Sequence, residues 1–171
     1  MRSRQKELLE LLDTSGAELF ALLTRLTLRE DIAEELMQEL FIKLQSSRGL
    51  DRAANPRAYA RRAAINLAFD WRRNHRRSVQ RLEKIRRRAS NDDSPLAIMI
   101  HSEELRETLD ALGRLKKASR EALVMRYIQQ ESYESIAEQM GKTSHQVRAM
   151  CSRAVHHLRQ ILGSNHRQFT T

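Results

Sequence analysis

Apolar residues recur at steps of three and four along most of this chain. In the first 26 residues they are Leu8, Leu12, Leu19, Leu22, Leu23 and Leu26. This spacing marks one face of an α-helix, whereas a half-buried strand alternates with period two. The chain has only five glycines and two prolines in 171 residues, too few for the many turns of a β-sandwich or barrel. The pattern therefore predicts an all-α protein.

Polar residues that favour turns and helix ends divide the helical pattern into two parts. Asn55-Pro56 predicts a helix start, with Asn as the N-cap and Pro in the first turn. The run from Ser90 to Pro95 is a polar break and the best candidate for a domain boundary. We therefore expect two small helical domains, residues 1–77 and 103–171, joined by a flexible linker at 78–102.

Two helices separated by a short turn form the strongest local motif, near the carboxyl end. Ala137 is small where the helices would pack, Gly141 permits the positive φ of the turn, and Val147 would lock the second helix onto the first. The spacing alone also fits an ordinary helical hairpin. Charge favours a DNA-binding helix-turn-helix, because no acidic residue follows Glu138. The candidate DNA-contacting residues are Ser144, His145, Gln146, Arg148, Ala149, Ser152 and Arg153.

The positive charge is concentrated in one segment. Between Arg57 and Arg88 there are twelve basic and two acidic residues, so this segment carries +10 in a chain whose formal charge is +9. Forked guanidinium groups suit phosphate recognition. A solvated helix face is the alternative. An acidic membrane surface is disfavoured because the segment has no bulky apolar face to insert.

Catalytic and metal sites are not expected. Cys151 falls on the buried stripe of its helix, and the nearby histidines lack the paired spacing of metal ligands. The sequence contains no glycine-rich phosphate loop and no nucleophile constellation. No apolar run approaches the ~20 residues of a membrane helix. We expect a cytoplasmic protein with no enzymatic activity, no metal, no cofactor and no membrane insertion.

These motifs together resemble the sigma-70 family of bacterial sigma factors. The run 112–162 is similar to sigma region 4, and the run 31–41 is similar to the core-binding helix of region 2. The run 55–59, followed by Arg62, Asn66 and Asp70, resembles the promoter-melting part of region 2. The linker is too short for an intervening region 3 domain. That plan is the one of the extracytoplasmic-function subgroup.

The resemblance implies a transcription initiation factor that binds core RNA polymerase and directs it to specific promoters. Its implied partners are the coiled coil of the largest polymerase subunit, the flap of the second-largest subunit, promoter DNA and an anti-sigma factor. An acidic rim around an apolar stripe suits such an interface. For Met37 and Phe41 a place in the core is the alternative. The matching polymerase-binding positions are Asp31, Glu34, Glu35, Met37, Gln38, Glu39 and Phe41.

The resemblance also assigns contacts with the downstream promoter element to a stretch of region 2. Asn66 would hold an unstacked base, while Arg72, Arg76 and Arg77 would contact phosphates. For Asp70 the alternative is a pair with a nearby arginine on the same helix. The chain departs from the family pattern at Tyr59, where tryptophan is usual, and at Met150, where a basic residue is common. The full set is Tyr59, Arg62, Asn66, Asp70, Arg72, Arg73, Arg76 and Arg77.

Two rival functions fit parts of the sequence. A one-component helix-turn-helix regulator that is not a sigma subunit would explain the carboxy-terminal motif, but it leaves the acidic helix at 31–41 without a role. A sigma mimic that sequesters another factor would not need the dense basic face.

Overall fold

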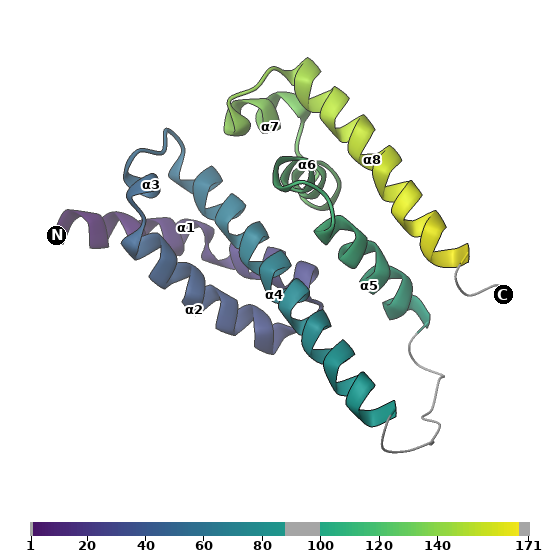
Figure 1. Ribbon diagram of the computed structural model, residues 1–171. Helices are drawn as coiled ribbons and strands as arrows, with labels where there is room; N and C mark the ends of the chain where they lie inside the picture. The colour runs from purple at the N-terminus through teal and green to yellow at the C-terminus, as the bar shows by residue number, and fades with distance from the viewer. Residues whose placement is uncertain (1, 88–99, 168–171) are drawn as a thin grey trace.

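The computed structural model describes residues 2–87 and 100–167, and no strand occurs in either range. The predicted all-α class is therefore confirmed. Figure 1 shows an amino-terminal half (residues 2–87) beside a carboxy-terminal half (residues 100–167). The first contains α1 (Arg2–Thr27), α2 (Glu30–Ser46), α3 (Arg48–Asp51) and α4 (Pro56–Arg87). The second contains α5 (Ile100–Gly113), α6 (Lys117–Leu123), the π-helical turn η1 (Val124–Ile128), α7 (Tyr133–Met140) and α8 (Ser144–Arg167).

The amino-terminal half is built on the predicted leucine stripes. Helices α1 and α2 contact each other, and α4 packs against both. Leu23 and Leu40 are fully buried among the three helices, together with Ile65 of α4. Burying one such side chain contributes about 1.5–3 kcal/mol. The periodic leucines are thus the core that places the outer faces of α2 and α4.

Capping residues and a left-handed glycine define several of the helix ends. The Oδ1 atom of Asn55 accepts a hydrogen bond of 2.9 Å from the Ala58 N–H, which confirms Asn55 as the cap of α4. Ser132 caps α7 by accepting a bond of 3.1 Å from the Ser135 N–H. Gly141 ends α7 in the left-handed region, with φ at 63°.

Helix α4 packs against helices of both halves. It contacts α1, α2 and α3 on one side and α5 and α6 on the other, as Figure 1 shows. It also runs past residue 77, where we placed the end of the first domain, and continues to Arg87. Helix α5 begins at Ile100, inside the predicted linker. The rest of that linker, 88–99, lies outside the described residues.

Two glycines with open space around them predict opposite stability changes. A Cβ added at Gly16 or at Gly141 would meet no atom within 4 Å. Gly16 lies inside α1, so Gly16→Ala should stabilise the fold by about 0.5–1 kcal/mol. Gly141 is left-handed, so Gly141→Ala should destabilise it by about 1–2 kcal/mol. Urea unfolding followed by circular dichroism measures both. A stabilising Gly141→Ala would contradict the turn geometry.

Candidate functional site

The carboxy-terminal motif is a helix-turn-helix with a reciprocal cap. Ala137 of α7 and Val147 of α8 are both buried, as the spacing predicts. The Oγ1 atom of Thr143 accepts a bond of 3.2 Å from the Gln146 N–H. In return the Gln146 side chain accepts one of 3.0 Å from the Thr143 N–H. This capping box fixes the start of α8, where a recognition helix contacts bases.

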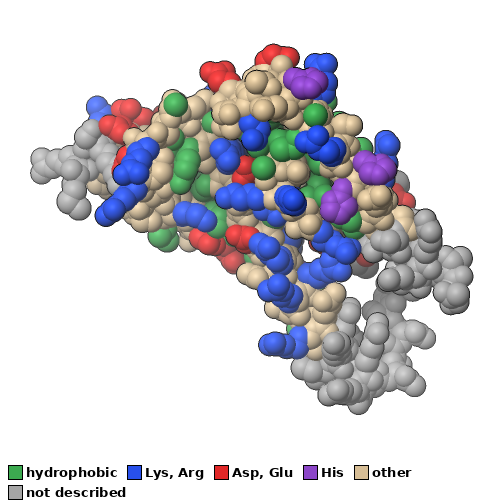
Figure 2. All heavy atoms as spheres, turned by 45° about the horizontal axis from the view of Figure 1, so that its top comes forward, with side chains coloured by type: hydrophobic (Ala, Val, Ile, Leu, Met, Phe, Trp, Pro, Cys, Tyr) green, Lys and Arg blue, Asp and Glu red, His purple; other side chains and the backbone are tan. Residues whose placement is uncertain are grey.

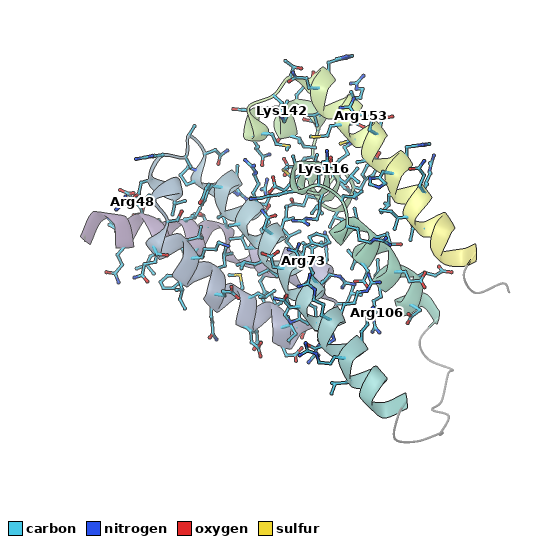
Figure 3. All side chains as sticks on the ribbon, in the orientation of Figure 1. Arg48, Arg73, Arg106, Lys116, Lys142 and Arg153 are labelled. Carbon is cyan, nitrogen blue, oxygen red and sulfur yellow. The ribbon has the colours of Figure 1, made fainter. Side chains whose placement is uncertain are left out.

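The outer face of α8 carries the predicted DNA-contacting residues. Ser144 and Ala149 are half-buried, and the exposed members are His145, Gln146, Arg148, Ser152 and Arg153. Figure 3 shows Lys142 and Arg153 at the α7–α8 end of the molecule, with Arg73 apart from them on α4. The Met150 side chain is half-buried and packs against the core.

Tyr133 is a residue of this surface that the sequence reasoning missed. The Arg148 guanidinium lies 5.1 Å from the centre of the Tyr133 ring. The Arg126 guanidinium lies 4.7 Å from the centre of the same ring. Cation–π contact of this kind orients a guanidinium without neutralising it. Tyr133 therefore sets the direction of Arg148, and only its tertiary position reveals this.

The second surface is the outer face of α2. Met37 and Phe41 are half-buried and pack against the core. The alternative considered for them, a place in the core, is therefore partly correct. Ile42 is 64% exposed and was not predicted as a site residue. It follows Glu35 by two helical turns and so lies on the same outer face. The exposed polar members of this face are Asp31, Glu34, Glu35, Gln38 and Glu39.

The third surface is the basic part of α4. Arg73, Arg76 and Arg77 are exposed, and Figure 2 shows Lys and Arg side chains gathered over the middle of one face and along the projecting end of the molecule. Asp70 pairs with Arg73, which confirms the intrahelical pair considered for it.

Arg72 differs from its neighbours on α4. It is only 7% exposed. Its guanidinium donates to the Leu26 carbonyl at 3.2 Å, the Arg106 carbonyl at 3.0 Å and the Asp110 carboxylate at 2.7 Å. These acceptors belong to α1 and α5. In this arrangement Arg72 joins three helices and does not face solvent, in contrast to the phosphate contact that the resemblance suggested.

Arg62 and Asn66, two of the residues predicted to contact the promoter, form hydrogen bonds with the carboxy-terminal half. Arg62 Nε donates to Glu121 at 2.9 Å, and Asn66 Nδ2 donates to the other oxygen of Glu121 at 2.7 Å. Arg120 donates to Asn66 Oδ1 at 2.9 Å. The Glu121 residue is 0% exposed. We call these four residues the Glu121 cluster; none of its contacts follows from spacing along the sequence.

A second polar contact joins the halves at the start of α4. Arg61 donates to Glu131 at 2.5 Å and to Glu18 at 2.6 Å, so it links α1 to the turn before α7. Arg57 also donates to Glu18, at 2.5 Å. Partial burial works to raise the pKa of Glu18, but the two arginines outweigh it and hold that pKa below its usual value.

Tyr59 is held against the short helix α3. Its hydroxyl lies 2.7 Å from Ser47 Oγ. A Cβ on Gly49 would lie 2.6 Å from the same hydroxyl, so this close approach requires glycine. Tyr59 is half-buried and lies one turn before Arg62 and Ala63 on α4.

The described residues contain no group of three or more His, Cys, Asp or Glu side chains that could hold a metal ion. Cys151 is 1% exposed, which confirms its predicted place on the packed stripe of α8. Burial raises the pKa of its thiol. Among the described helices, none has the length and apolar character needed to span a bilayer.

Comparison with solved structures finds similarity to chains of two complexes. The sigma factor RpoE bound to the anti-sigma factor NepR from Bartonella quintana aligns with 23% identity and a TM-score of 0.48, over 95% of this chain and 98% of that one. The RsbN–BldN complex aligns with 21% identity and a TM-score of 0.35, over 94% of this chain and 96% of that one.

Sequence comparison is more specific. The probable RNA polymerase sigma factor RfaY of Xanthomonas campestris pv. campestris is 30% identical over 136 residues, which are 75% of this chain and 34% of RfaY. The chain thus spans about a third of that relative's length. The family model for sigma-70 region 2 matches residues 11–78, and the model for sigma-70 region 4 matches residues 105–158. The two matches together span well over half of the chain, and it therefore belongs to the sigma-70 family, with the region 2 and region 4 plan of the extracytoplasmic-function subgroup.

Proposed function

We propose that this chain is a transcription initiation factor that binds core RNA polymerase and directs it to specific promoters. The supporting observation is that one chain carries an exposed acidic face on α2 and a helix-turn-helix whose α8 has a basic outer face. A one-component regulator would use only the second. The protein would act in the cytoplasm with its polymerase and supply promoter specificity rather than catalysis.

The α2 face is the proposed polymerase-binding surface. Ile42 is its exposed apolar centre, and Glu35, Gln38 and Glu39 form a polar rim around it. An apolar centre within a polar rim is the usual anatomy of a protein interface. Its proposed occupant is the coiled coil of the largest polymerase subunit, while the region 4 half would contact the flap of the second-largest subunit.

Helix α8 is the proposed reader of the upstream promoter element. Its amino end is exposed and capped, and an α-helix fits the major groove of DNA. Arg148 lies near that end, where base contacts are made, and Arg159 lies three turns further along. We assign base contact to Arg148 and expect Arg159 to contact only phosphate or nothing.

Region 2 would contact the downstream element only after a rearrangement. Asn66 and Arg62 are the proposed base-contacting residues, and both are bound to Glu121 in this structure. The two halves must therefore part at the Glu121 cluster before these side chains can reach melted DNA. Arg73, Arg76 and Arg77 are already exposed and are the proposed phosphate contacts. An anti-sigma factor, expected from the family, is a proposed partner that would act on the same equilibrium.

Run-off transcription with purified core polymerase tests the proposal directly. Core enzyme with this protein should give a defined transcript from a cognate promoter, and core enzyme alone should not. DNA binding by the protein without any polymerase-dependent transcript would favour the one-component regulator.

The polymerase surface predicts a charge-reversal effect. The double variant Glu35→Lys, Glu39→Lys should weaken association with core polymerase by at least about tenfold, since it reverses two rim charges. Helical circular dichroism should not change, because both side chains are exposed. The matched control is Glu103→Lys, Glu104→Lys on α5, also exposed. Equal loss in both variants would remove α2 from the interface.

The α8 assignment separates base reading from general attraction. Arg148→Ala should cost about 1–3 kcal/mol at the preferred upstream element and flatten discrimination among point-substituted elements. Arg159→Ala should weaken binding to every DNA or change little. Titrations at fixed salt compare the two. If Arg148→Ala loses affinity equally for all sequences, Arg148 is a phosphate contact.

The Glu121 cluster predicts that a neutral variant opens the molecule. Glu121→Gln keeps the size of the side chain but replaces one acceptor with a donor, so a charge-assisted bond worth about 1.5–3 kcal/mol is lost. Small-angle scattering should show a larger radius of gyration, and single-stranded DNA of the downstream element should bind more tightly. The control is Glu134→Gln, at an exposed glutamate of α7. Unchanged scattering and affinity would refute this role.

A further inference from the structure

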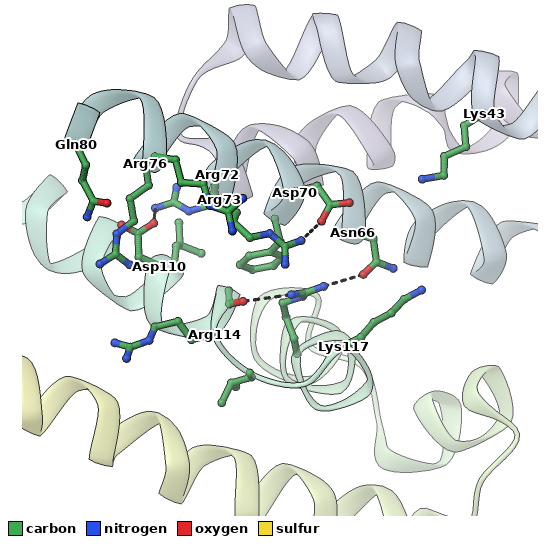
Figure 4. Close-up of a pocket in the computed structure, with 16 residues that line it drawn as sticks. Lys43, Asn66, Asp70, Arg72, Arg73, Arg76, Gln80, Asp110, Arg114 and Lys117 are labelled. Atoms are coloured by element: carbon green, nitrogen blue, oxygen red, sulfur yellow. Dashed lines mark hydrogen bonds and ion pairs between the residues drawn. The ribbon is translucent and has the colours of Figure 1, made fainter. Parts of the chain in front are cut away.

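A cavity of about 790 Å³ lies between α4 and the turn that joins α5 to α6. Figure 4 shows side chains of α4, including Arg73 and Arg76, on one side of it and Arg114 and Lys117 on the other. Both halves of the chain therefore contribute walls. The volume falls within the range of about 300–1,000 Å³ that is typical of small-molecule sites.

The lining of this cavity is strongly cationic. Its two carboxylates are already paired, Asp70 with Arg73 and Asp110 with Arg72. The eight basic residues among the described lining are Lys43, Arg72, Arg73, Arg76, Arg77, Arg114, Lys117 and Arg120. The cavity thus has an excess of positive charge that its own acids do not neutralise.

Two of the arginines are deeply buried with donors left over. Arg72 is 7% exposed and Arg120 is 5% exposed. The Nε atom of each is buried without a hydrogen-bond partner among the described residues. Within the described part of the chain, Arg120 donates only to neutral oxygens of Asn66 and Gly113. Its guanidinium lies 4.9 Å from the centre of the Phe69 ring. A buried cation that lacks an ion-paired partner is costly unless an anion offsets it.

Five more cations around the cavity are free to bind. Within the described ranges 5–82 and 103–163, none of these five side chains forms a hydrogen bond or an ion pair. They come from α2, from α4 and from the α5–α6 segment, so like charges converge from three directions and repel one another. The five are Lys43, Arg76, Arg77, Arg114 and Lys117.

We propose that this cavity binds a polyphosphate chain, carried by a nucleoside polyphosphate or by inorganic polyphosphate. Guanidinium and ammonium groups are the usual ligands of phosphate oxygens. A chain of several phosphates reaches cations on both walls, whereas a single phosphate reaches fewer. The ligand would bridge the two halves.

Bridging has a consequence for promoter contact. A ligand that binds both walls stabilises the closed arrangement by a free energy that grows with the logarithm of its concentration once this exceeds its dissociation constant. It would therefore keep Asn66 bound to Glu121. This consequence rests on the proposed function, but binding itself does not, so the test below uses neither polymerase nor promoter.

Calorimetric titration of the full chain tests binding with three probes. Inorganic tripolyphosphate and ATP should each bind at least about tenfold more tightly than orthophosphate, because several charge-assisted bonds replace one or two. ATP binding more tightly than tripolyphosphate would support a nucleoside ligand, and equal affinities would support the phosphate chain alone. Equal affinity for all three probes would refute the proposal.

Charge variants locate the site. Arg114→Glu, Lys117→Glu changes two exposed residues that we assign neither to DNA nor to polymerase, and it should reduce tripolyphosphate affinity by at least about tenfold. Arg114→Gln, Lys117→Gln should show a smaller loss with less perturbation of the fold. The control Arg153→Glu, Arg159→Glu makes the same charge change on α8 and should alter affinity less than about twofold.

Three results would overturn the assignment. The first is unchanged affinity in both Arg114, Lys117 variants, and the second is an equal loss in the α8 control. The third is a single-stranded oligonucleotide that displaces tripolyphosphate and depends equally on Arg114 and Lys117, since the cavity would then be part of a nucleic-acid surface.

Discussion

Glu121 is a carboxylate with no exposure to solvent, and such a charge has to be paired where it lies. Removing a carboxylate from water costs several kcal/mol unless close donors replace the lost hydration. The donors present are Arg62 and Asn66, both from α4. The position of α6 against α4 follows from this requirement. Helix α5 contacts α4 beside it, and the basic cavity lies where the turn from α5 to α6 faces α4.

Helix α4 therefore has two faces with different kinds of chemistry. Its apolar face, with Ala64, Ile65 and Ala68, is buried in the core with α1 and α2. Its polar face meets α5 and α6 largely through ion pairs and hydrogen bonds, including those of Arg62 and Arg72. These contacts can be replaced only by a partner that supplies equivalent charges and hydrogen-bonding groups. Helix α4 is thus part of the apolar core of the first half, whereas its contact with the second half depends largely on polar pairs.

How much of this could be predicted depends on the range of the interaction involved. The helices, the Asn55 cap and the left-handed Gly141 follow from local spacing, and the structure confirms them. Gly16 does not interrupt α1, because the leucine stripe on either side continues to pack. The recognition helix was predictable for the same local reason.

The buried contacts of the site were not predictable, because a charged residue in a sequence is normally expected to be exposed to solvent. Arg72 and Glu121 are charged residues that tertiary contacts bury, and their partners lie 34 to 59 residues away. Ile42 was missed for the opposite reason, since an apolar residue off the main stripe is exposed. Such assignments need coordinates, since only long-range pairing decides them.

The reciprocal cap at the start of α8 restricts how this protein can change over evolutionary time. Gln146 completes the helix cap through its side chain and also occupies the surface that would face DNA. A replacement selected for a different base would therefore also fray the helix that presents it. Among the described contacts, the neighbouring His145 and Ser152 side chains do not take part in the helix cap. On the proposed function, divergence of promoter preference among descendants of this chain should accumulate at those neighbours, with Gln146 conserved as a structural constraint.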